Sequence, residues 1–249
     1  MRQLQERHFS LFRTLADHCS FLTRRQIERI WTLPTNMTNK ELLWLVSEKY
    51  LRRRYRGDTF GHFQTPVYHL GELGWQMIGK PSDRYRGYRV EIERKAERGL
   101  EHTLLIYDVI LKFLFGSAVR RIIGSEDGMW QEALDLGIIP DAWIQFGGGE
   151  AFIEVDRATE RPTVVKKKLD KYMAMKNSGH YNTLFPSCGF KVLFFTTTEM
   201  RIESLERITT SDDIWFCTME EFLREPLDHA HWFALHNFYA LSDLGKEKV

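Results

Sequence analysis

The stretch "PDAWIQFGGGEAFIEVDRATERP", residues 140–162, contains two apolar runs separated by three glycines and Glu150. The runs at 142–146 and 151–156 have the length and composition of β-strands, and the glycines between them favour a β-hairpin. Glu154 and Asp156 stand two residues apart at the end of the second run. Because side chains at i and i+2 of a strand point to the same face, we expect these two carboxylates to lie side by side.

The register of this hairpin decides whether a third acid joins them. With an even-numbered turn of two or four residues, Asp141 pairs opposite Asp156 and Trp143 opposite Glu154, so that three carboxylates converge. An odd-numbered turn would instead place Asp141 on the opposite face. Acids this close repel one another unless a proton or a cation lies among them, and Mg²⁺ prefers oxygen ligands. The spacing therefore predicts a Mg²⁺ site suited to phosphodiester hydrolysis, whereas the alternative is that these acids only cap strands and form turns.

The residues that follow alternate between strand and helix patterns. Further strands are predicted at 190–197 and 214–218, with helices at 163–176, 199–207 and 219–224. This order predicts an α/β domain, with α+β character overall, in which helices flank a mixed sheet. Lys168 and Lys171 share a face of the first of these helices and lie either near the acids or on a solvated surface. The aromatic residues of the tail, Trp232, Phe233, Phe238 and Tyr239, either pack on the sheet or form an interface.

The N-terminal residues predict a different, mainly helical module. A first helix is expected at 6–18, and a second begins at the capping-box pair Thr23 and Gln26. A third is expected at 38–50, where Thr38 and Glu41 form a second such pair after Pro34 has ended the previous helix. Two short strands at about 50–56 and 66–70, joined by a glycine-containing tip, come next. Three helices and a hairpin resemble a winged helix, in which the third helix enters the DNA major groove.

Charge supports a polyanionic partner for this module. Residues 1–90 hold 16 Lys and Arg against 8 Asp and Glu, a net charge of +8, whereas 19 against 26 gives −7 over residues 91–249. We expect Thr38, Asn39 and Lys40 to contact bases at the start of the third helix. Contacts to phosphates are expected from Arg52, Arg53, Arg54 and Arg56. Alternatively, the arginines protect a strand edge from aggregation, or the module docks a protein partner.

Within the 249 residues we expect a winged-helix domain at 1–80, a linker at 81–88 and an α/β domain at 89–249 that includes a long connector helix at 89–116. No apolar run approaches the roughly 20 residues that span a bilayer, and the first residues lack the apolar core of a signal peptide. We therefore expect a cytoplasmic protein without a membrane partner. Cys19, Cys188 and Cys217 are too far apart in sequence to indicate a disulfide framework or a zinc site.

Pro140–Asp141, followed by Glu154–Val155–Asp156 and then by a lysine-rich helix, resembles the motif of the PD-(D/E)xK nucleases. The resemblance implies that Asp141 and Glu154 hold a divalent metal, Mg²⁺, with Asp156 as a third ligand or a group that orients water. The family usually has lysine where this chain has Asp156, and it implies that Lys168 or Lys171 on the following helix takes that role. Glu101 is the nearest match for a further acid of the family.

A closer resemblance covers most of the chain. "GLEHTLLIYDV", "IPDAWIQF" and "FIEVDRATE", in this order, are similar to the replication-relaxation family of plasmid proteins. The resemblance implies a winged helix, a helical connector and a nuclease-like domain that act on double-stranded plasmid or mobile-element DNA. It leaves two functions open. The protein is either a Mg²⁺-dependent endonuclease or nickase, or a non-catalytic replication or transcription regulator whose degenerate nuclease fold serves dimerisation or partner contact.

Overall fold

The computed structural model describes residues 2–55, 66–79, 99–116, 119–124, 138–146, 149–179, 189–234 and 237–240. The chain divides into two compact units, Met1–Leu111 and Lys112–Val249. The division falls within helix α6 (Leu100–Gly116), which matches the C-terminal part of the predicted connector helix. The predicted linker at 81–88 lies outside the described residues, so the boundary expected there stays a prediction.

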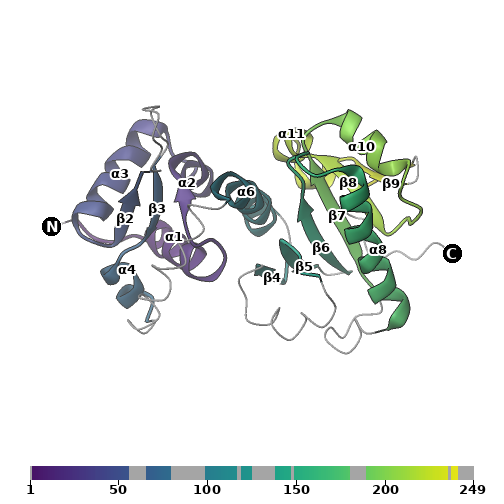
Figure 1. Ribbon diagram of the computed structural model, residues 1–249. Coiled ribbons are helices and arrows are strands. Elements are labelled where there is room, and N and C mark those ends of the chain that lie inside the picture. The colour runs from purple at the N-terminus through teal and green to yellow at the C-terminus, as the bar shows by residue number, and fades with distance from the viewer. Residues whose placement is uncertain are drawn as a thin grey trace. The chain divides into compact units, whose positions relative to one another are not determined.

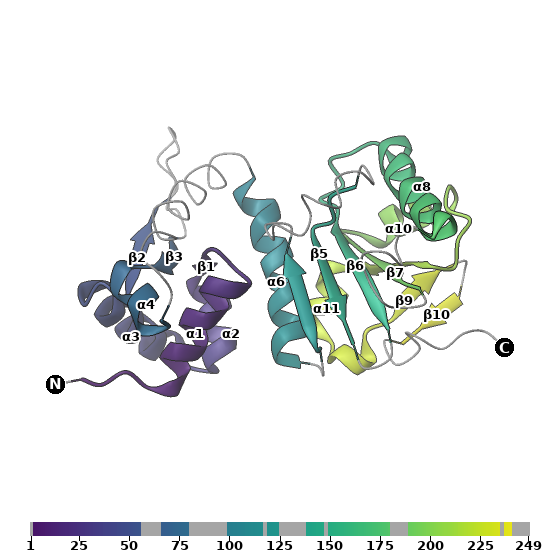
Figure 2. The same ribbon diagram turned by 90° about the horizontal axis from the view of Figure 1, so that it is seen from below.

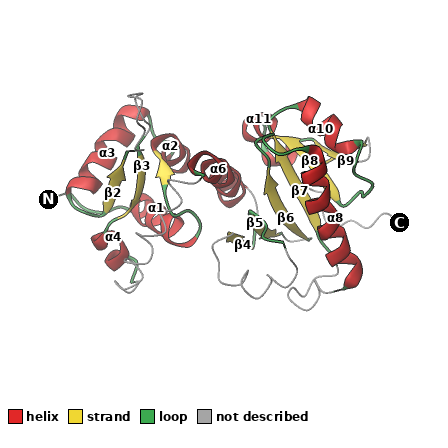
Figure 3. Cartoon of the chain, in the orientation of Figure 1, coloured by secondary structure: helices red, strands yellow, loops and turns green. Residues whose placement is uncertain are grey.

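The first unit contains four helices, apart from its share of α6, and a three-stranded antiparallel sheet in the order β1-β3-β2 within its described residues (Figure 3). Its elements are α1 (Glu6–Asp17), β1 (Leu22–Thr23), α2 (Arg24–Trp31), α3 (Thr35–Ser47), β2 (Leu51–Arg54), β3 (Val67–Leu70) and α4 (Glu72–Met77). The predicted capping box is confirmed, because the Thr23 side chain accepts from the Gln26 backbone and the Gln26 side chain returns to Thr23. Leu11, Phe12, Ile27 and Leu45 are buried in the core.

Helix α3 begins earlier than its sequence predicts. It starts at Thr35, directly after Pro34, and the Pro34 carbonyl accepts the Thr38 backbone N–H at 2.9 Å. The predicted capping box of Thr38 and Glu41 is therefore wrong, since both residues lie inside the helix. The Thr38 hydroxyl is buried and donates to the same Pro34 carbonyl at 3.2 Å. Pro34 is the N-cap residue, and no side chain caps this end of the helix.

The second unit is a mixed α/β layer structure, as expected. Its seven-stranded sheet has the order β10-β9-β8-β7-β6-β5-β4, and Figure 2 shows this sheet from a second direction. Strands β6, β7 and β8 are parallel and the remaining neighbours antiparallel. The strands are β4 (Arg121–Gly124), β5 (Ala142–Gln145), β6 (Glu150–Val155), β7 (Lys191–Thr196), β8 (Ile214–Thr218), β9 (Trp232–Ala234) and β10 (Asn237–Tyr239).

Helices cover both faces of this sheet. Phe152, Phe194 and Phe216 point to the face covered by α8 (Pro162–Ser178) and α10 (Glu199–Glu206), where they share one core with Leu169 and Leu205. Both helices, and the strands β6, β7 and β8 that carry these phenylalanines, were predicted to within two residues. In the described part of the chain, no helix has both the length and the apolar character that crossing a membrane would require.

The tail forms the strands β9 and β10 at one edge of this sheet, and its residues Trp232 and Tyr239 pack on the face opposite α8 and α10. Phe195 contacts Phe222 of α11 (Met219–Arg224) and Trp232 of β9, with ring centroids 4.6 and 5.2 Å apart. Trp232 is fully buried, and Tyr239 stacks on Trp215 at 4.9 Å. Of the two readings of the tail, packing on the sheet is therefore the one that holds for these aromatic residues.

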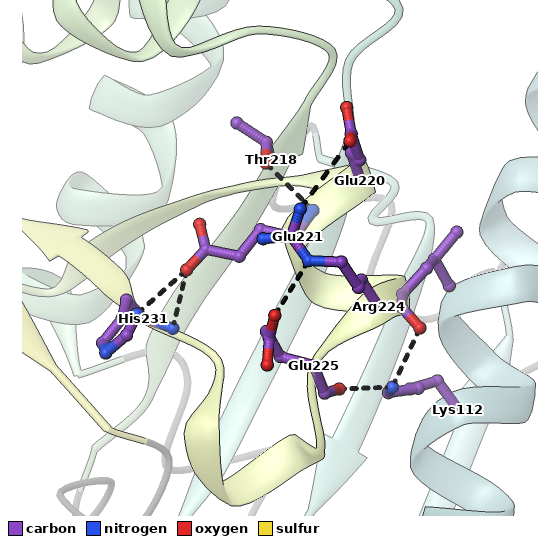
Figure 4. Close-up of polar contacts among 8 residues, drawn as sticks. Lys112, Thr218, Glu220, Glu221, Arg224, Glu225 and His231 are labelled. Carbon is purple, nitrogen blue, oxygen red and sulfur yellow. Dashed lines mark hydrogen bonds and ion pairs between the residues drawn. The ribbon is translucent and has the colours of Figure 1, made fainter.

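Polar contacts fix α11 at both of its ends (Figure 4). The Thr218 side chain accepts from the Glu221 backbone N–H at 3.2 Å, which caps the first turn. Lys112 donates to the carbonyls of Leu223 and Glu225 at 3.2 and 2.6 Å, where the last turn leaves acceptors without helical partners. The Glu221 carboxylate also accepts from the His231 backbone at 3.3 Å, which ties the helix to the chain entering β9.

Candidate active site

The β5–β6 hairpin carries the acids in a register that differs from the predicted one. Ala142 pairs with Ile153 and Trp143 with Phe152, so the pairing of Trp143 with Glu154 and of Asp141 with Asp156 is wrong. The Phe146 backbone N–H donates to the Gly149 carbonyl at 2.8 Å and closes the turn one residue earlier than expected. Such a change moves the register by two residues, and it therefore leaves each side chain on its predicted face.

Asp141 consequently lies level with Glu154. The Asp141 backbone N–H donates to the Ile153 carbonyl at 3.1 Å, and its carboxylate accepts from the Val155 N–H at 2.8 Å. These two bonds flank Glu154 and hold Asp141 at the end of the ladder. Glu154 itself is only 2% exposed, whereas Asp141 is half-buried. The hairpin thus brings two of the three predicted acids together.

Helix α8 supplies the partners of Glu154. Its buried residues Val165, Leu169 and Tyr172 pack on the sheet, and this orientation turns Lys168 toward β6. Lys168 donates to one oxygen of Glu154 and the Tyr172 hydroxyl donates to the other. Lys168 and Tyr172 are four residues apart, so they lie on one face of the helix. Of the two candidate lysines, Lys168 reaches the acids, whereas the Lys171 side chain is exposed.

Electrostatics make Glu154 an unusual carboxyl group. Burial and then the negative charge of Asp141 raise its pKa from 4.5 to about 7, although Lys168 and Tyr172 oppose this change. Burial alone would lower the pKa of Lys168, but the charges of Glu154 and Asp141 outweigh it and raise that pKa. Burial and the Glu154 charge raise the pKa of Tyr172 well above its usual range. Lys168 is thus a cation and Tyr172 a neutral donor at neutral pH.

Asp156 has different partners. One of its oxygens accepts from the Ala158 N–H at 2.9 Å and the other from Arg201 Nε at 2.7 Å. The Arg201 guanidinium also donates to the Glu160 carbonyl at 2.7 Å, so it holds both ends of the loop between β6 and α8. Ala158 in this loop has a positive φ of 58°. Asp156 therefore orders the loop that leads into α8.

The predicted convergence of three carboxylates is not found. Among the described residues, no group of three or more His, Cys, Asp or Glu side chains is arranged to hold a metal ion. The site instead consists of Asp141, Glu154, Lys168 and Tyr172. Two carboxylates are the oxygen donors that Mg²⁺ accepts when it keeps most of its waters, so this pair fits such an ion in kind.

The residues expected to bind DNA lie on α3 and β2. Asn39, Lys40, Arg52 and Arg53 are exposed, and Arg54 is half-buried. Arg56 lies outside the described residues. Thr38 is fully buried, which contradicts the base contact predicted for it. Glu41 is also buried, where it pairs with Arg7 at 2.9 Å, with His8 at 3.1 Å and with Arg2.

Two residues of the site were missed by sequence reasoning. Tyr172 had a usable signal, because it follows Lys168 by one helical turn in a helix expected to pack beside the acids. Arg201 had none, since it lies 45 residues after Asp156 and only the fold brings the two together. Glu101 belongs to the first unit, and its role stays a prediction.

A protein-family model described as replication-relaxation matches residues 12–187, which is more than half of the chain. The matched segment includes α3, β2, Asp141, Glu154 and all of α8. No curated protein matches the chain.

Proposed function

The chain belongs to the replication-relaxation family, and we propose that it binds plasmid or mobile-element DNA and nicks it with a divalent metal ion. The family relates the protein to the replication or relaxation of such DNA. The observation that carries the cleavage proposal is the pairing of Asp141 with Glu154 beside a lysine on the following helix. DNA of this kind would be met in the cytoplasm, in line with the sequence-based expectation.

DNA binding is proposed for the first unit. The element order α1–β1–α2–α3–β2–β3 supports the proposal of a winged helix, in which the third helix would enter the major groove. Exposed Lys40 on α3, together with exposed Arg52 and Arg53 on β2, would meet phosphates. The acid of α3, Glu41, is buried against three basic side chains and presents no charge to solvent that would repel a polyanion.

Cleavage is proposed for the second unit, with Asp141 and Glu154 as the residues that would hold Mg²⁺. When bound, such an ion polarises a phosphate oxygen and lowers the pKa of a coordinated water. Lys168 would stabilise negative charge that develops on the phosphate, because it is charged and reaches both Glu154 and solvent. Tyr172 fixes the orientation of Glu154, and Asp156 with Arg201 positions the loop before α8.

The test uses purified protein, supercoiled plasmid and Mg²⁺ or Mn²⁺. We expect the wild type to convert plasmid to the open-circular form and Asp141→Asn and Lys168→Gln to lose this activity. Asn can still accept from the Val155 N–H, so that variant removes charge rather than the hairpin contact. Lys167→Gln, an exposed neighbour on α8, serves as the matched control and should nick normally. Equal nicking by Asp141→Asn, or none with any divalent ion, overturns the proposal.

One observation favours the second function, a non-catalytic regulator. Both oxygens of Glu154 accept hydrogen bonds from within the protein, one from Lys168 and one from Tyr172. Such a saturated carboxylate can serve as a structural link between β6 and α8, and the domain would then serve dimerisation or partner contact. This function predicts DNA binding that is the same with and without EDTA, with no nicking under any condition.

A further inference from the structure

Helix α3 turns two large apolar side chains to solvent. Leu43 is 57% exposed and Met37 is 46% exposed, although Leu42 and Leu45 on the same helix are almost fully buried. The outward face, as we define it, consists of the exposed residues Asn36, Met37, Asn39, Lys40, Leu43 and Ser47. Asn39 and Leu43 are one turn apart and so lie next to each other on it. Packing of the core does not account for Leu43 and Met37, because they point away from it.

The charges around this face match a polyanion. Glu41 is the only acid in α3, and it points inward to Arg7, His8 and Arg2. The outward face of α3 therefore carries the cation Lys40 and no carboxylate. Strand β2 packs against α3 and exposes Arg52 and Arg53. An apolar patch that carries the cation Lys40 and no acid of its own fits nucleic acid better than it fits a second copy of this face, which would bring like charges together.

We propose that the outward face of α3 recognises A·T base pairs in the major groove, with Leu43 and Met37 on thymine methyl groups and Asn39 on adenine. This inference rests on the proposed DNA binding. The thymine methyl is the one apolar group that the four standard bases present in the major groove. Asn can make two hydrogen bonds to the N6 and N7 positions of adenine, so the same face would recognise both members of the pair. Thr38, expected from sequence to contact bases, is buried and takes no part in this contact.

The experiment compares DNA containing thymine with DNA of the same sequence containing deoxyuridine, which lacks only the methyl group. Duplexes selected from a random pool by the full-length protein are resynthesised with each thymine replaced in turn. We expect affinity to fall about fourfold for each methyl group that is contacted, the equivalent of one buried methylene. Leu43→Ala and Met37→Ala should each abolish this difference at the thymine that the replaced residue contacts, and Asn39→Ala should relax the preference for adenine. Leu73→Ala, which removes another exposed leucine of the first unit, should retain both.

The outcomes separate the two proposals. If the protein binds duplex DNA but binds thymine and deoxyuridine equally, or if Leu43→Ala keeps the difference, the inference about α3 is wrong and DNA binding stands. If no DNA is bound even at low salt, both are wrong. If Leu43→Ala instead abolishes self-association measured by sedimentation, α3 is an interface between copies and the inference is again overturned. Thermal unfolding of each variant establishes that the fold is retained.

Discussion

At the scale of single residues, Glu154 is the group on which the proposed chemistry depends. It is buried beside another carboxylate, which favours its protonated form, and it contacts Lys168 and Tyr172, which favour the charged form. A metal ion binds only the charged form. A pKa of about 7 therefore places the change between a protonated group and a metal ligand near neutral pH.

The raised pKa of Glu154 predicts a specific dependence of stability on pH. Because this pKa is higher in the folded protein than its ordinary value of 4.5, the contribution of Glu154 is fully present below pH 4.5 and is lost as pH rises to about 7. We expect the stability of the wild type relative to Glu154→Gln to fall across this window, by on the order of 3 kcal/mol. Urea unfolding at a series of pH values measures the difference, and parallel curves for the two proteins would contradict the expectation.

Replacing Tyr172 by Phe tests whether its hydroxyl, the second hydrogen-bond donor to Glu154, stabilises the charged carboxylate. The variant removes the hydroxyl that donates to Glu154 and leaves the packing of the ring on Phe152 and Phe190 unchanged. We expect a loss of about 1–2 kcal/mol at neutral pH. The window described for Glu154 should also move to higher pH, since a donor to the charged carboxylate is lost. The same unfolding series measures both effects, and an unchanged window would mean that the hydroxyl does not act on Glu154.

At the scale of elements, local patterns predicted the strands β5 to β8 and the helices α8, α10 and α11 because each has a clear apolar period and clear ends. The short strands β4, β9 and β10 were not predicted. Pro162 begins α8 and Gly179, in the left-handed region, ends it. The hairpin register was not predictable in the same way, since three successive glycines allow the turn at more than one position. The register differs from the predicted one by two residues, and a shift of two keeps each side chain on the same face of the strand. Asp141 and Glu154 therefore share a face, as expected.

Contacts between elements that are distant in the sequence could not be predicted from it. Asp156 finds Arg201 and Glu41 finds His8, pairs that are 45 and 33 residues apart. No periodicity links such residues, because their meeting depends on how whole elements pack. For this reason the prediction of Asp156 as a third metal ligand failed, because its carboxylate accepts a hydrogen bond from Arg201 instead.

The buried contacts of Glu41 predict that it anchors α3 to α1. Replacing Glu41 by Ala leaves buried His8 and two arginines without their common partner, and we expect a loss of roughly 2–4 kcal/mol of stability. Glu6→Ala is the matched control on α1, because its pair with Arg13 is exposed and should contribute less than about 1 kcal/mol. Chemical unfolding of both variants is the measurement. An equal loss of stability in the two variants would show that the buried contacts of Glu41 contribute no more than an exposed ion pair.

At the scale of the whole molecule, the sequence carries opposite charges in its two parts. The first 90 residues have a net charge of +8 and the remainder −7. This distribution supports the proposal that the N-terminal part binds DNA and that the acidic part would hold a metal ion. A polyanion attracts the first part, whereas a carboxylate pair requires a cation before it can approach a phosphate.

Salt dependence tests the role of the basic part. Each phosphate contact that is lost should reduce the slope of log affinity against log salt by about 1. We therefore expect Arg52→Gln and Arg53→Gln each to produce such a reduction, measured by fluorescence anisotropy with labelled duplex. Arg13→Gln, which removes an exposed arginine paired with Glu6, should leave the slope unchanged. Equal slopes for all variants would contradict phosphate binding by β2.

The central claim is that Asp141 and Glu154 together bind a divalent cation. Calorimetric titration of the purified protein with Mn²⁺ and Mg²⁺ at pH 8, above the pKa of Glu154, tests it without any assumption about DNA or catalysis. We expect one ion per chain for the wild type, affinity that weakens as pH falls below about 7, and loss of binding in Asp141→Asn but not in Lys167→Gln. Absence of binding to the wild type, or equal binding by Asp141→Asn, would contradict it.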